Sequence, residues 1–297
     1  MHRLFDGHPE LWVMPGETFL HYNKHRWPNL SRSVEMKNFN IAYEHNEGIP
    51  VWHLFHASVL KKKQKNFEYD NPDFDIDFDR FLLGWRESMA ACDQWSERKI
   101  IETYFENLFD RLASHPRRNT DHVVIKTPRL GLDHRRFFDL FPDGRLIMMR
   151  RSLKSYVGSE LTRNGFPPSG LRDRARRYKL ITRYTRLHRF AELVYDEIRG
   201  NDRVALVDYE TLTEQSEAEM RRLASFTGIS YDEILTVPSV YGRPWISNSS
   251  FREAREGTRG RVTARKGGSS GLTAFEETLV DQLYRRLPIL PLEKALA

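Results

Sequence analysis

Short runs of aliphatic and β-branched residues alternate with helical patterns along the second half of the chain. Segments 122–125, 145–149 and 203–207 each predict a short strand, the first of them a buried parallel strand. Segments 133–140 and 217–226 have the three- and four-residue apolar spacing of helices. Strands joined through crossover helices predict an α/β fold with a parallel sheet covered by helices on both faces.

An amphipathic helix is predicted over residues 171–187, where apolar residues recur every three or four positions (Leu171, Ala175, Tyr178, Ile181, Tyr184, Leu187). Its other face is basic and carries Arg172, Arg174, Arg176, Arg177, Lys179, Arg183, Arg186 and Arg189. We favour a solvated basic face. The alternative is a surface that steers an anionic acceptor or polymer.

The C-terminal part changes composition twice. Residues 245–271 are rich in Ser, Gly, Arg and Thr, which predicts a long basic loop, either disordered or ordered by a ligand. Residues 272–287 return to helical spacing. The length of 297 residues suits one large domain or two small ones, and we expect a single domain over residues 1–297.

Composition narrows the class of protein. Of the 297 residues, 39% are hydrophobic, which supplies a proper core and argues against intrinsic disorder. The net charge of +6 favours an anionic partner weakly, since both signs are abundant. A single cysteine, Cys92, excludes a disulfide scaffold and suits a reducing compartment. With no apolar run of membrane-spanning length, we expect a soluble, cytoplasmic protein.

Several common sites are excluded by spacing. The acidic run from Asp70 to Asp79 lacks the glycine and the final glutamate of a calcium loop. His53, His56 and His134 have no partners at metal-ligand spacing, so we expect no metal. Neither the G-x-x-x-x-G-K-[ST] phosphate loop nor a G-x-S-x-G nucleophile elbow occurs.

A cradle for a phosphate group is predicted at the strand ends. Lys126 and Arg151 each follow a predicted strand, where open α/β sheets bind their ligands. Ser159 lies eight residues after Arg151 in the following helix, and Arg163 lies one turn further on the same face. Arginines and a hydroxyl near a helix start suit a phosphate dianion.

The segment from Ile147 to Ser159 resembles the part of sulfotransferases that binds the 3′-phosphate of 3′-phosphoadenosine 5′-phosphosulfate (PAPS): a strand, an arginine, seven residues and a serine. Only Arg151, not Arg150, has the serine at that spacing. Further segments resemble the family in order along the chain: 4–10, 125–128, 140–143, 207–212, 248–251 and 265–267. The resemblance implies a three-layer α/β/α fold with a central parallel sheet, similar to P-loop nucleotide hydrolases.

The resemblance also implies roles for single residues. Lys126 would stabilise charge on the transferring group, and Glu17, in a Gly-Glu-Thr stretch similar to that of tyrosylprotein-type sulfotransferases, would be the base. A solvated loop carboxylate is the alternative for Glu17. The nucleotide-binding residues implied are Arg151, Ser159, Arg163, Tyr209, Arg265 and Lys266.

By this resemblance, Met1 corresponds to a position after the family's first strand and its loop around the 5′-phosphosulfate, so we expect this chain to lack both. Two explanations stay open: a natural protein that is longer, which we favour, or a remnant that binds nucleotide without catalysis.

We therefore expect a PAPS-dependent sulfotransferase, with PAPS as co-substrate. The acceptor stays open among small hydroxylated molecules, carbohydrates, peptides and lipids, and the aromatic residues between 52 and 78 are candidates to line its pocket. The alternative function is a non-catalytic basic binder of nucleic acid or another polyanion through the helix at 172–189. We expect no nucleic-acid partner.

Overall fold

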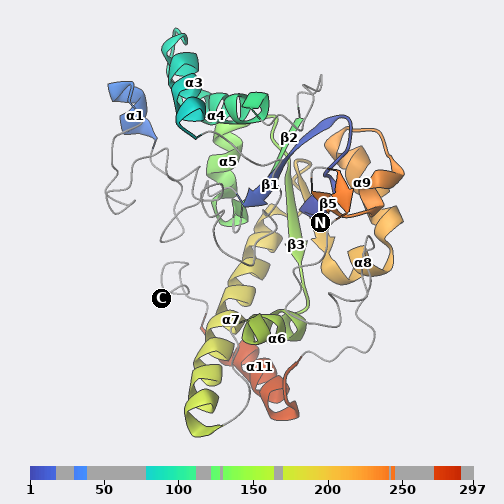
Figure 1. The fold of residues 1–297 in the computed structure, drawn as a ribbon. Helices are drawn as coiled ribbons and strands as arrows, with labels where there is room; N and C mark the ends of the chain where they lie inside the picture. Colours follow the sequence, from blue (N-terminus) through green and yellow to red (C-terminus); the bar gives the residue numbers. More distant parts are fainter. Residues whose placement is uncertain are drawn as a thin grey trace. The chain divides into compact units, whose positions relative to one another are not determined.

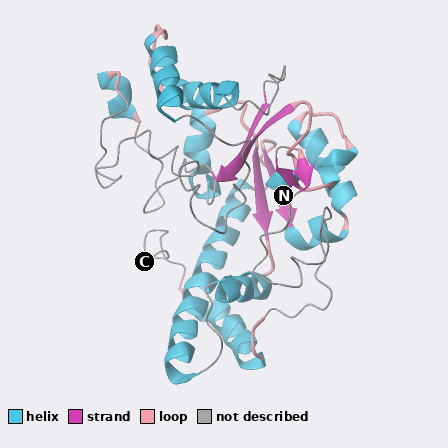
Figure 2. Cartoon of the chain, viewed as in Figure 1, coloured by secondary structure: helices cyan, strands magenta, loops and turns pink. Residues whose placement is uncertain are grey.

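The computed structural model describes residues 1–17, 30–38, 78–111, 122–127, 130–163, 170–240, 242–244 and 271–288. These residues form two compact units. Helices and strands are both present among them (Figure 2). Unit 1 comprises residues 1–144 and 227–248, and unit 2 comprises residues 145–226 and 249–297.

Unit 1 contains one parallel and one antiparallel strand pair together with helices (Figure 1). Its strands are β1 (Leu11–Glu17), β2 (His122–Lys126), β5 (Ser239–Val240) and β6 (Arg243–Pro244). Its helices are η1 (His2–Leu4), α1 (Ser31–Met36), α3 (Phe78–Ala90), α4 (Glu97–Arg111), η5 (Leu130–Asp133), α5 (His134–Leu140) and η6 (Glu233–Thr236). β1 pairs with β2, and β5 pairs with β6.

Aromatic side chains join α3 to α4 in the core of unit 1. Trp85 and Phe81 on α3 each meet the ring of Tyr104 on α4 edge-on, with centroids 5.3 Å apart. The three side chains are almost fully buried. The Trp85 indole N–H donates to Thr103 Oγ1 at 3.0 Å, which satisfies the polar edge of the buried ring.

The first ten residues are attached to the segment after residue 227 through buried polar groups. Asp6 accepts from Ser239 Oγ at 2.6 Å and from the Gly242 N–H at 2.8 Å. Gly7, the residue after Asp6, has a φ of +83°, and a Cβ at this position would lie 2.9 Å from Ile234 Cδ1. The positive φ is what requires glycine here, because the end of the Ile234 side chain can shift to admit a Cβ.

Unit 2 is built on a parallel strand pair and a long helix. β3 (Leu146–Arg150) pairs in parallel with β4 (Val204–Asp208). Its helices are α6 (Leu153–Arg163), α7 (Gly170–Ile198), α8 (Tyr209–Glu214), α9 (Ser216–Thr227) and α11 (Ala274–Arg286). α6 and α11 both pack on α7 around a core of Val157, Leu161, Ile181, Tyr184 and Val280.

A buried ion pair attaches α11 to α7. Arg177 donates through Nε to Glu276 Oε1 at 2.6 Å and through Nη2 to Oε2 at 2.8 Å. Glu276 also accepts from the Thr273 N–H, and Thr273 Oγ1 accepts from the Glu276 N–H, which completes a capping box at the start of α11. The Arg177 guanidinium holds the pKa of Glu276 below its ordinary value by direct hydrogen bonding.

The predicted α/β class, with parallel strands, is confirmed by these elements. The three strands predicted from apolar runs are present as β2, β3 and β4, and the predicted helices are present as α5, α7, α9 and α11. The prediction that the first of these strands is buried was wrong, because Val123 in β2 is 44% exposed. Strand β1 was not predicted, since Pro15 and Gly16 interrupt its apolar pattern.

The predicted faces of α7 were partly wrong in its N-terminal half. Arg177, assigned to the solvated basic face, is buried, whereas Tyr178, assigned to the apolar face, is 51% exposed. The reason is the Glu276 carboxylate, which neutralises the Arg177 guanidinium inside unit 2. Arg174, Arg176, Lys179 and Arg183 are exposed as predicted.

We expect Glu276→Gln to lower the free energy of unfolding at pH 7 by about 3 kcal/mol, because it leaves the buried Arg177 charge without its counter-ion. The double variant Arg177→Met/Glu276→Gln removes both charges and keeps a capping-box residue, so it should regain much of that loss. Urea unfolding followed by circular dichroism measures both effects. Arg177→Met is the second single variant. A double variant whose loss of unfolding free energy equals the sum of the losses in the two single variants would contradict the pairing.

The same pair predicts a pH dependence. The pKa of Glu276 is lower in the folded state, so the pair stabilises fully above the unfolded pKa, whose ordinary value is 4.5. This stabilisation is lost as the pH falls through the folded pKa. The stability difference between wild type and Glu276→Gln should therefore shrink progressively when unfolding is measured at decreasing pH below 4.5. A difference that stays constant down to pH 2.5 would show that the carboxylate charge is not what Arg177 requires.

Candidate active site

The carboxyl ends of β3 and β4 carry an ion pair that fixes Arg150. Arg150 and Asp208 are register partners at the ends of the two strands. Arg150 Nε donates to Asp208 Oδ1 at 2.7 Å, and this hydrogen bond raises the pKa of the arginine above its ordinary value. Glu192 on α7 lies 4.0 Å from Arg150 Nη1. Arg150 is therefore engaged in holding the strand ends together.

The next residue, Arg151, has different surroundings. Its Nε donates to Ser155 Oγ at 2.9 Å, and its guanidinium carbon lies 4.6 Å from the centroid of the Tyr209 ring. Within the described ranges Arg151 forms no ion pair with a carboxylate. Two protein contacts thus orient the guanidinium, and its charge is not neutralised by an acidic side chain of the described residues.

Helix α6 carries the other two candidates that were predicted from the spacing after Arg151. Ser159 lies in the second turn of the helix and is half-buried, and Arg163 is the last residue of the helix. The side chain of Arg163 is outside the described residues. The structure therefore brings Arg151 and Tyr209 into contact and places Ser159 on the helix that begins just after Arg151.

The start of α6 is capped by a carboxylate that the sequence reasoning missed. The N–H and the hydroxyl of Ser152 both donate to Glu210 Oε1, at 3.2 and 3.0 Å. Glu210 follows Tyr209 at the end of β4, at the same sheet edge as Arg151. Its position directly after a predicted strand end was the signal that could have identified it. An acidic group near a helix N-terminus stabilises the helix.

In unit 1, the structure brings the two predicted catalytic residues together. Lys126 is the last residue of β2, and Glu17, the last residue of β1, is its register partner. The pairing is regular at Val13 and Val124 and then shifts, so that three β1 residues face one β2 residue before Glu17. Pro15 lies within this irregularity and has no N–H to donate. Glu17 is thus at a strand end, and its side chain lies outside the described residues.

The half-buried imidazole of His2 lies within the electrostatic influence of Arg3 and Lys126. Lys126 is exposed. Burial, together with the charges of Arg3 and Lys126, lowers the pKa of His2 to about 3. His2 therefore stays neutral at pH 7, with its Nε2 2.6 Å from the carbonyl of Met14 in β1. This contact joins the neutral imidazole to the strand that ends at Glu17.

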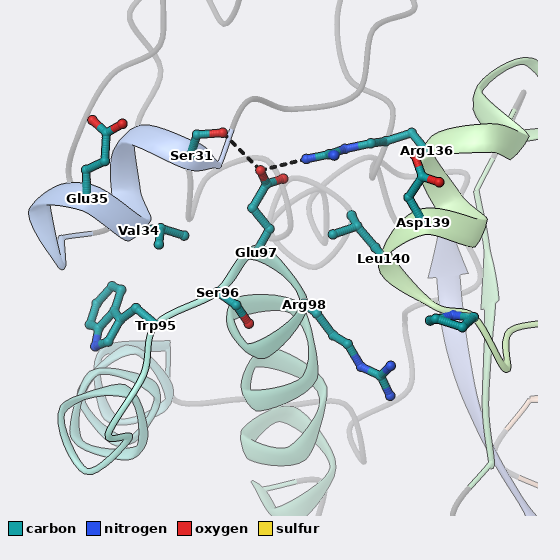
Figure 3. A pocket seen from close by; sticks show the side chains of 11 residues that line it. Ser31, Val34, Glu35, Trp95, Ser96, Glu97, Arg98, Arg136, Asp139 and Leu140 are labelled. Carbon is teal, nitrogen blue, oxygen red and sulfur yellow. Dashed lines mark hydrogen bonds and ion pairs between the residues drawn. The ribbon is translucent and has the colours of Figure 1, made fainter.

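A pocket of about 630 Å³ lies in unit 1, between α1, the start of α4 and the end of α5 (Figure 3). Glu97 projects into the middle of it and accepts from Ser31 Oγ at 3.0 Å and from Arg136 Nη2 at 2.6 Å. Trp95, Val34 and Leu140 supply apolar walls. The pocket thus combines apolar walls with charged side chains, of which Glu97 and Arg136 are paired with each other.

Three predictions fall outside the described residues. These are the nucleotide contacts of Arg265 and Lys266, the loop over 245–271 and most of the aromatic stretch proposed to line an acceptor pocket, and all of them stay predictions. Among the residues that the structure describes, no cluster of histidine, cysteine and acidic side chains could hold a metal ion. The described helices include none that is long and apolar enough to cross a membrane.

Comparisons with known proteins place the chain in a family. The model of the sulfotransferase family matches residues 1–233. No protein with curated annotation matches the chain significantly. A solved structure, the sulfotransferase domain from the curacin biosynthetic pathway, is similar with 14% sequence identity and a TM-score of 0.45, over 100% of this chain and 90% of that one. On the family match, which spans most of its length, the chain belongs to the sulfotransferase family.

Proposed function

We propose that the protein transfers a sulfuryl group from PAPS to a hydroxyl or amine of an acceptor. The observation that supports nucleotide binding in this proposal is the set of contacts around Arg151. A guanidinium at a strand end, oriented by Ser155 and Tyr209 and unpaired with a described carboxylate, suits a phosphate dianion. Family membership supports sulfuryl transfer as the reaction class.

Unit 2 holds the nucleotide in this proposal. Arg151 binds the 3′-phosphate through charge-assisted hydrogen bonds, and Ser159 adds a hydroxyl donor from α6. Tyr209, whose ring lies against Arg151, borders the same nucleotide. Arg163, Arg265 and Lys266 are proposed as further nucleotide contacts on the family resemblance alone.

Lys126 and Glu17 supply the chemistry in this proposal. Lys126 stabilises the negative charge that develops on the leaving phosphate oxygen as the sulfur–oxygen bond of PAPS breaks. Glu17, its register partner, takes the proton from the acceptor hydroxyl while the acceptor oxygen forms its bond to sulfur. The products are a sulfated acceptor and 3′-phosphoadenosine 5′-phosphate (PAP). No metal is part of this proposal.

We expect PAP to bind the wild type with micromolar affinity and Arg151→Ala about 10- to 100-fold more weakly, because two charge-assisted hydrogen bonds are lost. The matched control is Arg221→Ala, which removes an exposed arginine of α9 from the same unit. Isothermal titration calorimetry measures both. Equal affinity for PAP and ADP in the wild type would contradict the 3′-phosphate site.

Salt dependence separates this function from polyanion binding by the exposed arginines of α7. A protein that binds a single-stranded phosphate backbone through several arginines loses affinity steeply as salt rises, with a slope of about 0.7 per phosphate contact on a log–log plot. PAP binding between 50 and 300 mM NaCl should show a slope of about 2 or less. A steep slope with a single-stranded oligonucleotide, and no PAP binding, would favour the alternative.

The catalytic roles are tested with radiolabelled PAPS and a panel of acceptors: a phenol, a tyrosine peptide and an oligosaccharide. With an acceptor that is sulfated by the wild type, Lys126→Ala should lower kcat about 10²-fold or more while PAP affinity changes little. Glu17→Gln should lower kcat by a similar factor, because the amide cannot take a proton. Full activity of Glu17→Gln would assign the proton transfer to another group.

A further inference from the structure

The turn between β3 and α6 consists of two residues, Arg151 and Ser152, whose backbone groups lie beyond the strand pairing. Buried or half-buried backbone groups outside a ladder need other partners. The Ser152 N–H has Glu210. The carbonyl of Arg151 has His188 of α7, whose Nε2 lies 2.8 Å from it. This histidine plays no part in the function proposed above.

The imidazole of His188 is held by packing and by this hydrogen bond. A carbonyl can only accept, so Nε2 carries the hydrogen and donates it. The ring lies 5.8 Å from the ring of Tyr156 on α6 and 6.3 Å from that of Tyr284 on α11. The other nitrogen, Nδ1, is buried and has no hydrogen-bond partner in the described ranges. The hydrogen bond from Nε2 to the Arg151 carbonyl is thus the polar contact that orients the ring.

The spacing along α7 shows that this contact is part of an ordered series. Tyr195, seven residues after His188 and on the same helix face, donates its hydroxyl to the carbonyl of Met149 at 2.9 Å. Burial raises the pKa of Tyr195 to about 12, so its hydroxyl stays a donor at pH 7. Carbonyls two residues apart point to the same edge of a strand. One face of α7 therefore binds successive outward carbonyls, and His188 binds the one that belongs to Arg151.

We propose that His188 is a positioning residue for the 3′-phosphate: it fixes the peptide of Arg151 and thereby directs the guanidinium. This inference rests on the proposed function. With the backbone fixed by His188 and the side chain by Ser155 and Tyr209, Arg151 loses little freedom when an anion binds. Such preorganisation strengthens binding without any contact between His188 and the ligand.

The test compares PAP with adenosine 5′-phosphate, which lacks the 3′-phosphate, by calorimetry on full-length variants. His188→Met keeps the volume and removes the donor, and should weaken PAP binding by about tenfold, the size of one hydrogen bond. Affinity for adenosine 5′-phosphate should stay within about twofold, since Arg151 does not contact it in this assignment. His188→Gln keeps an N–H donor on a side chain of similar reach and should restore most of the preference for PAP.

Tyr195→Phe is the matched control. It removes a hydrogen bond from the same helix face to β3, two residues before Arg151, but leaves the peptide of Arg151 untouched. It should lower stability to a similar extent as His188→Met and keep the wild-type preference for PAP over adenosine 5′-phosphate. Equal losses of both nucleotides in His188→Met, or no loss of either, would overturn the positioning role.

A second readout needs no nucleotide and separates this inference from the proposed function. The Arg151 Nε–H signal in the NMR spectrum, assigned by its disappearance in Arg151→Lys, should be sharp and shifted in the wild type because Ser155 holds it. In His188→Met it should move to the position of a solvated arginine. If the wild type fails to prefer PAP, the proposed function fails, and this signal still decides whether His188 orders Arg151. An unchanged signal in His188→Met would overturn the inference.

Discussion

The ion pair between Arg150 and Asp208 determines what the neighbouring residues of unit 2 can do. Two parallel strands end side by side, and the last side chain of each is used to join them. Arg150 is the last residue of β3 and is engaged by Asp208, whereas Arg151, the first residue of the turn, is directed toward Ser155 and Tyr209. Two adjacent arginines of the same chemistry thereby acquire different roles, one structural and one available to an anion.

Helix α7 serves as the common support of this region. Over its 29 residues it carries Arg177 for α11, His188 for the β3–α6 turn and Tyr195 for β3 itself. Each contact is directed to a defined atom by a hydrogen bond, whereas the apolar core between α6, α7 and α11 provides the undirected part of the packing. A helix packed by apolar contacts alone would tolerate small shifts along its axis. These polar contacts oppose such shifts, because a hydrogen bond weakens as its distance and angle depart from the preferred geometry.

Local patterns were sufficient to predict the strands and helices whose apolar residues are continuous. The runs that became β3 and β4 were placed to within a residue, and Arg151 was distinguished from Arg150 by its spacing to Ser159. Features that depend on distant residues could not be predicted. The burial of Arg177 depends on Glu276, 99 residues away, and β1 is recognisable as a strand only through its pairing with β2. His188 has no sequence signal at all, because its partner is a backbone carbonyl.

The irregular pairing of β1 with β2 has a consequence for how this part of the chain can change. Three residues of β1 span the distance that one residue spans on β2 between Val13 and Glu17. Losing one residue from this stretch would shift the register at the strand ends, so that Glu17 would no longer be the pairing partner of Lys126. The length of the Met14–Gly16 stretch therefore fixes the register between Glu17 and Lys126. Substitutions in this stretch should be tolerated far better than insertions or deletions.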